Sequence, residues 1–470
     1  MAPILQSKER GPACMPSSPS SAGTRRLDGQ TRLLLLVNGL YITASLLSGT
    51  FLGIYIWKAS RNFVLLGWFT LLTHVLMAVT FWIAGYLAKK GRSGTCIRLG
   101  IGVSAVFYGI VLLLGKAAVN YVWLLGMVQG LAVGLFWLGF NVIYFEATNA
   151  ANRDKFNGFA GVTGSLVGMA APWGSGYFIS HMAGESGYRI IFMVSLGIFV
   201  AGVLVSFLLH NREPGGQYQW RLPAKIWRVP RTPWRPVIGA LIAQGFRETV
   251  FGVLIGLLVY IHTGSEMKLG NYSLITQIVA FVTFFAVGRW LKPRWRRIGM
   301  LVGTIAMTLV ILPFFFGVNY TTLLIFGIGT SLFIPFFTIP MTSSVFDLIG
   351  TNEESVRQRS EYVVLRELSL NVGRILGMTV FIVTLSISKA PAVINWMMLL
   401  IGSAPIISWF FMRDRLAPKL ERDHSAARAV PFFVQGSEER DHVRHKRPAL
   451  EHIAHGDFQG NDDAREQPQT

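Results

Sequence analysis

The sequence predicts an all-α polytopic membrane protein whose twelve transmembrane helices form two pseudo-symmetric six-helix bundles. Three observations support this: apolar runs such as 33–57 and 190–209 recur along the chain, charged residues make up only 14% of it, and short words repeat between its halves. A helix rises about 1.5 Å per residue and the hydrocarbon core is about 30 Å thick, so about 20 apolar residues can cross it.

Composition excludes two other classes of protein. Hydrophobic residues make up 52% of the chain, and the charged fraction is far below the ~25% that is usual in soluble domains. A transmembrane β-barrel would show segments of about ten residues with alternating hydrophobicity, and the sequence lacks them. The chain therefore belongs with helical membrane proteins.

Each predicted span is an apolar run between polar segments. In the first half the spans are 32–57, 62–87, 97–115, 119–147, 156–181 and 188–210. In the second half they are 236–262, 270–291, 297–316, 319–348, 362–387 and 391–412. These spans define a bundle over 32–210, a cytoplasmic central loop over 211–235 and a second bundle over 236–412. The polar segments 1–31 and 413–470 are predicted to be disordered cytoplasmic tails.

Basic residues are concentrated in alternate loops. The loops that an inside N-terminus would place in the cytoplasm hold eighteen Lys and Arg residues, and the opposite loops hold six. The positive-inside bias therefore predicts a multi-pass protein of the cytoplasmic (inner) membrane with both termini inside. The same bias accounts for most of the net charge of +19, so we do not expect nucleic-acid binding.

No cofactor or metal is indicated. The cysteines, Cys14 and Cys96, are too few for a thiolate cluster or a disulfide framework. Five of the nine histidines lie in the C-terminal tail, but scattered spacings on a flexible segment fix no coordination geometry. We interpret that segment as a solvated tail. No G-x-x-x-x-G-K-[ST] loop occurs, so ATP hydrolysis is not expected.

Short matches relate the two halves at a nearly constant offset. GLAVGLF at 130–136 and GIGTSLF at 327–333 are 197 residues apart, and Phe145-Glu146 and Phe346-Asp347 are 201 apart. The basic turns that begin at Gly85 and Gly288 are 203 apart. Two six-helix halves of this kind predict a substrate site between them near the bilayer midplane.

This arrangement resembles the major facilitator superfamily over roughly residues 30–412. The family's loop between helices 2 and 3 usually reads G-x-L-a-D-R-x-G-R. Here the loop reads GYLAKKGR over 85–92, one residue shorter and with Lys89 in place of the acid. The glycines around Pro172 are similar to a loosened G-x-x-x-G-P-x-x-G-G signature of drug exporters, whereas Gly126 stands where their fourth helix carries an Arg. The resemblance implies a transporter and not an enzyme.

Glu248 lies near the middle of the span 236–262, beside Arg247. An ionised group inside a bilayer costs about 2.5–3.5 kcal/mol, so each needs a partner or a wet cavity. Adjacent residues point ~100° apart on a helix, so the two cannot simply face each other. One hypothesis is substrate or proton handling, with H⁺ as the coupling ion at Glu248. The alternative is a structural role that locks the helix to a neighbour.

The span 362–387 carries a polar stripe of Glu367, Asn371 and Arg374 at i, i+4 and i+7. We expect the stripe to face the central cavity or another helix. In one hypothesis Arg374 pairs with Glu248 or binds an anionic group of the substrate. In the alternative it pairs with Glu367, although a rise of ~10.5 Å is too long for contact unless both side chains bend together.

Three further residues are candidates for the cavity lining: Asn38 and Tyr41 in the first span and His74 in the second. The alternative for His74 is a hydrogen-bonded structural residue, the commoner role of a lone histidine in a membrane.

Glu146 and Asp347 end the spans 119–147 and 319–348 beside strongly basic loops. We predict that they form inner-gate ion pairs, because exposed pairs worth about 0–1 kcal/mol suit a latch that must open. The basic members of this predicted gate are Arg92, Arg98, Arg296 and Arg297. The alternative is ordinary helix-end charge in the headgroup region.

Together these features predict a monomeric secondary active transporter that moves a small solute across the lipid bilayer. Few acids and the presence of Arg247 and Arg374 favour an anionic or amphipathic substrate. The alternative is a non-transporting scaffold or partner of an envelope enzyme, in which the buried charges only hold the fold together. An enzyme acting on lipid carriers is disfavoured because its outer loops would need more acidic and histidine side chains than they contain.

Overall fold

The computed structural model describes residues 27–416 except 149–151, 212–215, 230–231 and 350–356. Every regular element in this part of the chain is a helix. The predicted disordered tails lie almost entirely outside the described residues, since α1 already begins at Gly29 and the description ends at residue 416.

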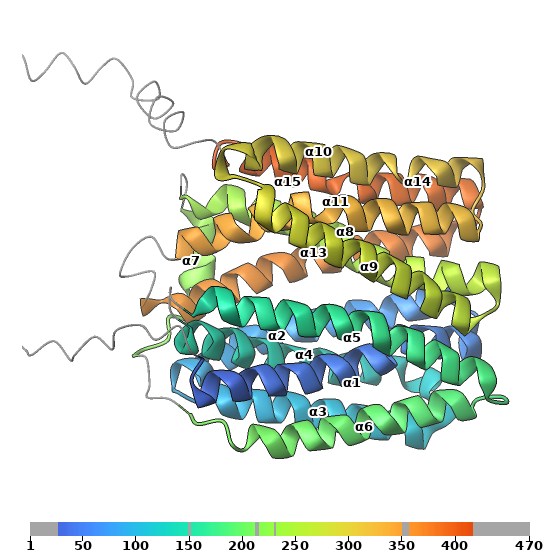
Figure 1. The fold of residues 1–470 in the computed structure, drawn as a ribbon, viewed down its shortest axis with the longest axis horizontal. Helices are drawn as coiled ribbons and strands as arrows, with labels where there is room; N and C mark the ends of the chain where they lie inside the picture. The colour runs from blue at the N-terminus through green and yellow to red at the C-terminus, as the bar shows by residue number, and fades with distance from the viewer. Residues whose placement is uncertain (1–26, 149–151, 212–215, 230–231, 350–356, 417–470) are drawn as a thin grey trace, which may run out of the picture. The chain divides into compact units, whose positions relative to one another are not determined.

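The first half of the chain forms helices close to the predicted spans (Figure 1). They are α1 (Gly29–Ser60), α2 (Phe63–Lys89), α3 (Ser93–Leu114), α4 (Val122–Ala147), α5 (Arg153–His181) and α6 (Ser186–Ser206). The fourth span, predicted from residue 119, is α-helical from Val122, because Gly115–Tyr121 is a 3₁₀ helix that joins α3 to α4.

The second half departs from the predicted spans in three places. Its α-helices are α7 (Leu222–Arg228), α8 (Trp234–Thr263), α9 (Glu266–Trp290), α10 (Arg296–Leu309), α11 (Tyr320–Ile349), α13 (Arg359–Ile387), α14 (Pro391–Gly402) and α15 (Ala404–Met412). The predicted central loop contains α7. The span 297–316 is α-helical only to Leu309 and ends in a 3₁₀ turn, Leu312–Phe316, that contains Pro313. The span 391–412 is interrupted at Ser403, just before Pro405, which lacks the N–H that a continuous helix would use.

Local sequence sets several of the helix starts. The carboxylate of Asp28 accepts a hydrogen bond from the Thr31 N–H at 2.8 Å, and Asn62 caps α2 through the Val64 N–H at 2.9 Å. Ser265 caps α9 through the Lys268 N–H at 3.3 Å. Such side chains satisfy backbone donors that have no partner in the first helical turn.

Ten helical stretches of the described chain are long and apolar enough to cross a membrane. One of them, Ser93–Ala147, holds two predicted spans, α3 and α4. The predicted span 156–181 is α5, which is not among the ten. This helix is rich in glycine and serine, which contribute less apolar surface than the Leu, Ile and Phe of the other helices.

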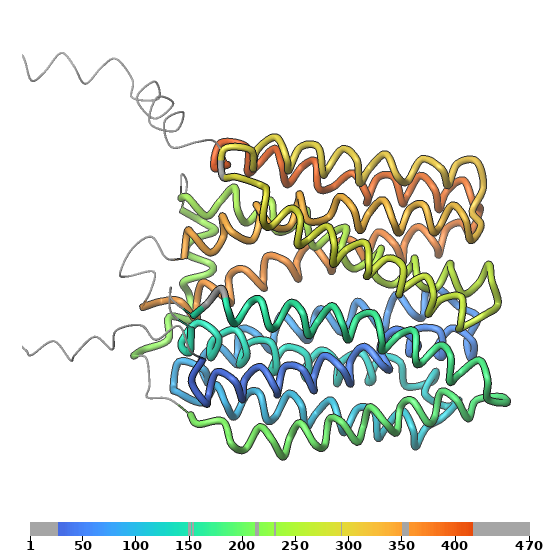
Figure 2. Tube along the Cα trace, in the orientation of Figure 1, coloured from blue at the N-terminus to red at the C-terminus, as the bar shows by residue number. Residues whose placement is uncertain are grey.

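We describe the helices in two groups, according to the half of the chain that they come from. In the N-terminal group (α1–α6), α4 packs on α2 and α3, while α1 packs on α5 and α6. In the C-terminal group (α8–α15), α8 packs on α13 and α15, and α11 packs on α9 and α10. The groups meet mainly where α2 lies against α13 and α5 lies against α9. We call the end at which α1 begins and α15 ends the terminal end, and the opposite one the far end; α7 lies at the terminal end (Figure 2).

Glycines bring α8 and α13 into close contact. A Cβ atom added at Gly245 would collide with the Leu370 carbonyl oxygen, and one at Gly373 would collide with that of Ile242. Small residues allow helix backbones to approach closely within a membrane. This crossing places Arg247 and Glu248 of α8 next to the polar stripe of α13.

Candidate functional site

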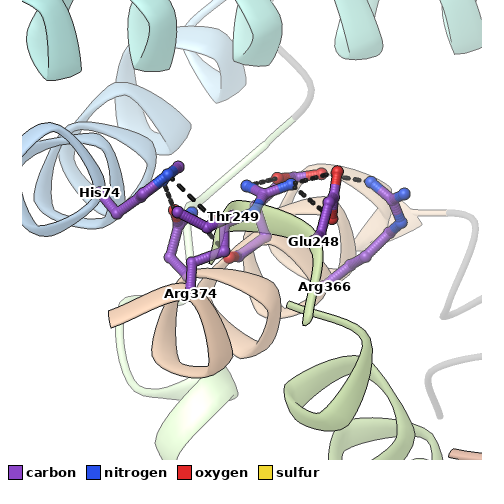
Figure 3. A network of polar contacts seen from close by, with 7 residues as sticks. His74, Glu248, Thr249, Arg366 and Arg374 are labelled. Atoms are coloured by element: carbon purple, nitrogen blue, oxygen red, sulfur yellow. Dashed lines mark hydrogen bonds and ion pairs between the residues drawn. The ribbon is translucent and has the colours of Figure 1, made fainter. Parts of the chain in front are cut away.

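A network of charged side chains joins α8 to α13 at this crossing (Figure 3). Arg374 lies 3.3 Å from the Glu248 carboxylate and 3.8 Å from the Glu367 carboxylate. Arg366 forms an ion pair with Glu367. The Arg374 side chain is 13% exposed and that of Glu367 8% exposed, whereas Glu248 is 52% exposed. Glu248 is therefore the most exposed side chain of the network.

The two hypotheses for Arg374 prove to be compatible. Its contact with Glu248 is the predicted pair between helices, and its contact with Glu367 is the pair that the seven-residue separation disfavoured. That spacing does not prevent contact, because the long Arg374 side chain bends along the helix while Glu367 bends toward it. Each guanidinium nitrogen, Nη1 and Nη2, then serves a different carboxylate.

His74 connects the N-terminal group to this network. Its Nδ1 lies 3.2 Å from Asn371 Oδ1 in α13, and its Nε2 lies 3.2 Å from Thr249 Oγ1 in α8. Asn371 Nδ2 donates to the Glu367 carbonyl at 2.9 Å, which leaves its Oδ1 as an acceptor. A neutral His74 with its proton on Nδ1 satisfies both contacts, since Nε2 then accepts from the Thr249 hydroxyl. His74 is thus a hydrogen-bonded link between α2, α8 and α13.

Arg247 lines a cavity of about 310 Å³, which we call the Arg247 cavity. The residue is 7% exposed, and its guanidinium lies 4.8 Å from the centre of the Phe251 ring. Its Nε and Nη2 atoms make no hydrogen bond within the described part of the chain. Other polar residues on the wall are Gln244, Glu248, Thr276, Thr330, Ser331 and Thr338.

A second cavity of about 370 Å³ lies between the two groups of helices. This interface cavity is lined by Thr50 and Leu66 from α1 and α2 and by Gly256 from α8. Its wall shares Phe251 and Tyr272 with the Arg247 cavity. The two cavities therefore adjoin each other at these residues.

The structure does not bring Asn38 and Tyr41 to this site. Tyr41 is 4% exposed and stacks on Phe136, with ring centroids 3.4 Å apart and further edge contacts to Trp137 and Phe199. Asn38, one turn earlier on α1, is 4% exposed. Neither lines the Arg247 cavity or the interface cavity. Because α1 is apolar on nearly all sides, its sequence does not show which face meets a cavity.

At the terminal end a buried ion pair, absent from the predicted gate, joins the two groups. Lys89 at the end of α2 lies 3.1 Å from Glu361 near the start of α13, with side chains 6% and 0% exposed. Lys89 also donates to the Arg357 carbonyl at 2.6 Å, and the Gln219 N–H donates to Glu361 at 3.3 Å. In the sequence Lys89 is distinguished only by standing where the family's loop has an acid, and nothing there indicates Glu361 as its partner.

The predicted gate residues have varied surroundings. Asp347 and Arg296 form the expected pair, at 3.9 Å between an exposed Asp347 side chain and a partly buried Arg296 side chain. Glu146 lines a cavity of about 250 Å³ together with Lys89, Arg357 and Arg359.

The remaining predicted gate residues are Arg92, Arg98 and Arg297. Arg98 instead donates to the carbonyl oxygens of Ser206 and Leu209 at 3.2 and 2.5 Å, so it caps the end of α6. Arg92 is exposed beside the start of α3, and the Arg297 carbonyl accepts from Trp409 at 3.0 Å.

A second ion pair joins the two groups at the far end. Lys58 at the end of α1 lies 3.0 Å from Glu266 at the start of α9. The Tyr188 hydroxyl of α6 donates to the same carboxylate at 2.8 Å. In the sequence Lys58 and Glu266 look like ordinary loop charges, because nothing in the chain shows that residues 208 positions apart meet.

Within the described residues no group of three or more His, Cys, Asp or Glu side chains is arranged to hold a metal ion. The ionisable residues of the site are instead paired cations and anions, with Arg247 set apart.

Comparison with known proteins agrees with this architecture. The family model described as Major Facilitator Superfamily matches residues 34–355. The chain is 34% identical over 383 residues to the uncharacterized protein YqgE of Bacillus subtilis (strain 168), covering 81% of this chain and 88% of that protein. It is also 40% identical over 171 residues to an uncharacterized protein in the sodM 3′ region of Geobacillus stearothermophilus, covering 36% of this chain and 80% of that protein.

Two solved structures share the fold. The nucleoside transporter NupG superimposes with a TM-score of 0.62 at 14% identity, covering 82% of this chain and 98% of NupG. A variant of the E. coli fucose:proton symporter FucP superimposes with a TM-score of 0.58 at 15% identity, with the same coverage. The match to the family model extends over more than half of the chain, and the B. subtilis relative matches most of its length. The chain is a multi-pass membrane protein that belongs to the major facilitator superfamily.

Proposed function

We propose that this protein is a secondary active transporter that moves a small solute across the cytoplasmic membrane by alternating access. The observation that carries the proposal is the network of Arg374, Glu248, Glu367 and His74, which keeps ionised groups at depth and connects both groups of helices. Charged side chains are expensive inside a membrane and commonly mark substrate or ion pathways. Membership of the major facilitator superfamily supports the same activity.

We propose that the chain crosses the membrane twelve times, in two halves over 32–210 and 236–412, with both termini in the cytoplasm. The described helices supply six crossings in each half if α14 and α15 together form the last one. The excess of Lys and Arg in alternate loops supports this orientation. The terminal end would then be cytoplasmic.

The two ion pairs between the groups serve as gates in this proposal. Lys89–Glu361 closes the terminal end and Lys58–Glu266 closes the far end, and each joins a helix of one group to a helix of the other. Rocking of the halves would break either of these pairs while keeping the other. It would expose the interface cavity, and the Arg247 cavity that adjoins it, to one side at a time.

Glu248 is the proposed proton site. It is paired with Arg374, but it is also half-exposed and lines the Arg247 cavity, so a proton can reach it from that space. Protonation would leave Arg374 with Glu367 as its remaining carboxylate partner. A change of charge at this position would therefore alter the contact between α8 and α13.

Alternating access can be tested without knowing the solute. A single cysteine is introduced as Ser331→Cys, on the wall of the Arg247 cavity, in a chain that carries Cys14→Ser and Cys96→Ala. Labelling with a membrane-impermeant maleimide is then measured from each side of sealed vesicles. We expect Lys89→Gln to increase labelling from the cytoplasmic side and Lys58→Gln to increase it from the opposite side.

Lys116→Gln is the matched control. Lys116 pairs with Glu185 at 3.4 Å, but both belong to the N-terminal group and both are exposed. Its loss should leave labelling unchanged. If neither gate variant changes the sidedness of labelling, the alternating-access proposal fails and a scaffold role is favoured.

A further inference from the structure

Arg247 is a buried cation beside the network that forms no ion pair of its own among the described residues, although Glu248 lies on the same cavity wall. The other two arginines, Arg366 and Arg374, contact the carboxylates of Glu367 and Glu248. Three guanidinium groups therefore share two carboxylates, which leaves one excess positive charge at this depth. Leaving a buried charge uncompensated is strongly destabilising, so its retention indicates a partner that is not part of the chain.

The geometry indicates where such a partner would sit. Arg247 is 93% buried, since 7% of it is exposed, and it lies on the wall of the Arg247 cavity. Its Nε and Nη2 atoms are free donors within the described residues. Two adjacent guanidinium donors match the two oxygens of a planar oxyanion such as a carboxylate. Glu248 is paired with Arg374 at 3.3 Å, and it forms no hydrogen bond with these two Arg247 donors.

The rest of the wall restricts the shape and polarity of the ligand. The Thr330 hydroxyl is also buried without a hydrogen-bond partner among the described residues and lies on the same wall. Phe251 and Phe326 stack at 5.4 Å and supply an apolar surface beside the guanidinium. A volume of about 310 Å³ is at the small end of ligand pockets.

We propose that the Arg247 cavity binds a small organic carboxylate, with its anionic end on Arg247 and its apolar body against Phe251 and Phe326. This inference rests on the proposed transport function and names the class of its substrate. A cationic ligand would add to the excess positive charge, and a neutral one would leave Arg247 unpaired. Thr330 would bind a second polar group of the ligand.

The test measures binding by the full-length protein in detergent micelles. The probes are acetate, hexanoate, benzoate and 3-phenylpropionate, each compared with its primary amide, which has a similar shape and no charge. Ligand-dependent shifts in the unfolding temperature report binding to the folded state. We expect hexanoate, benzoate or 3-phenylpropionate to stabilise the protein and its amide not to.

Variants then assign the binding to Arg247. Arg247→Gln should weaken carboxylate binding by about 10- to 150-fold, the effect of losing a charged hydrogen-bond pair, and Thr330→Val should weaken it less. Arg247→Gln removes an unpaired buried charge, so the unliganded protein should unfold at the same or a higher temperature. Arg235→Gln, an exposed arginine on the same helix, is the control and should bind as the parent does.

Two outcomes would overturn the inference: carboxylates and amides that bind alike, or carboxylate binding that Arg247→Gln leaves unchanged. Sided cysteine labelling separates this result from the transport proposal. Alternation without carboxylate selectivity would refute the substrate class alone, whereas selectivity without alternation would refute transport and leave the binding site.

Discussion

The buried pair Lys89–Glu361 permits a sharp prediction, because it is a closed ionic contact that the proposed transport cycle must break. Lys89→Met removes the cation and leaves the Glu361 carboxylate, which is 0% exposed, with the Gln219 N–H as donor at 3.3 Å. Methionine preserves most of the length of the lysine stem, so the perturbation is mainly the loss of charge.

The expected magnitude follows from burial. Removing one partner of a buried ion pair costs about 3–5 kcal/mol, because the remaining charge is left without compensation. In a conformation that is open at the terminal end, water would solvate Glu361 and this cost would disappear. The ratio of open to closed molecules should therefore rise by a factor of about 10² to 10³·⁵.

The assay is maleimide labelling of Ser331→Cys from the cytoplasmic side, measured as a rate in sealed vesicles. The double variant Lys89→Met/Glu361→Met is the essential comparison, since replacing both members of a buried pair by apolar residues is often neutral for stability. It should label more slowly than Lys89→Met alone. The exchanged pair Lys89→Glu/Glu361→Lys should return partly toward the parent rate.

The reasoning is refuted if Lys89→Met and the double variant label at the same rate. That result would mean that the uncompensated carboxylate has no role in the effect and that Lys89 acts only through its contact with the Arg357 carbonyl. If every variant is labelled at the same rate as the parent protein, the Lys89–Glu361 pair does not hold the terminal end closed.

Two further predictions concern packing and pH. Gly245→Ala should lower the unfolding free energy by about 1–3 kcal/mol, because its Cβ meets the Leu370 carbonyl, whereas Gly252→Ala on the same helix has open space and should not; equal unfolding temperatures for both would contradict the close α8–α13 contact. Burial raises the pKa of the Tyr218 hydroxyl, which donates to the Trp82 carbonyl at 3.2 Å. A hydroxyl whose pKa is raised in the folded protein contributes stability at pH values below its unfolded pKa of about 10. This stability is lost as the pH rises toward the folded pKa. The unfolding temperatures at pH 8 and pH 11 should therefore differ less in Tyr218→Phe than in the parent.

The sequence determined the approximate positions of the helices and a few ionic contacts, among them that of Arg374 with Glu248. Apolar runs longer than the bilayer is thick leave few alternatives to a helix, so nearly all predicted spans appear within a few residues. The pairing of Arg374 with Glu248 was predictable for a related reason. Charge is so scarce in these spans that few opposite charges could meet at that depth.

The tertiary structure decided the partners that lie far apart in the chain. Lys89 and Glu361 are separated by 272 positions, and each looked like an ordinary charge at a helix end until the packing of α2 on α13 brought them together. The faces of α1 and the direction of Arg247 were also settled only by packing. An apolar helix shows no preferred face in its sequence. Which of two adjacent charged residues forms an ion pair depends on the side chains that neighbouring helices bring close to them.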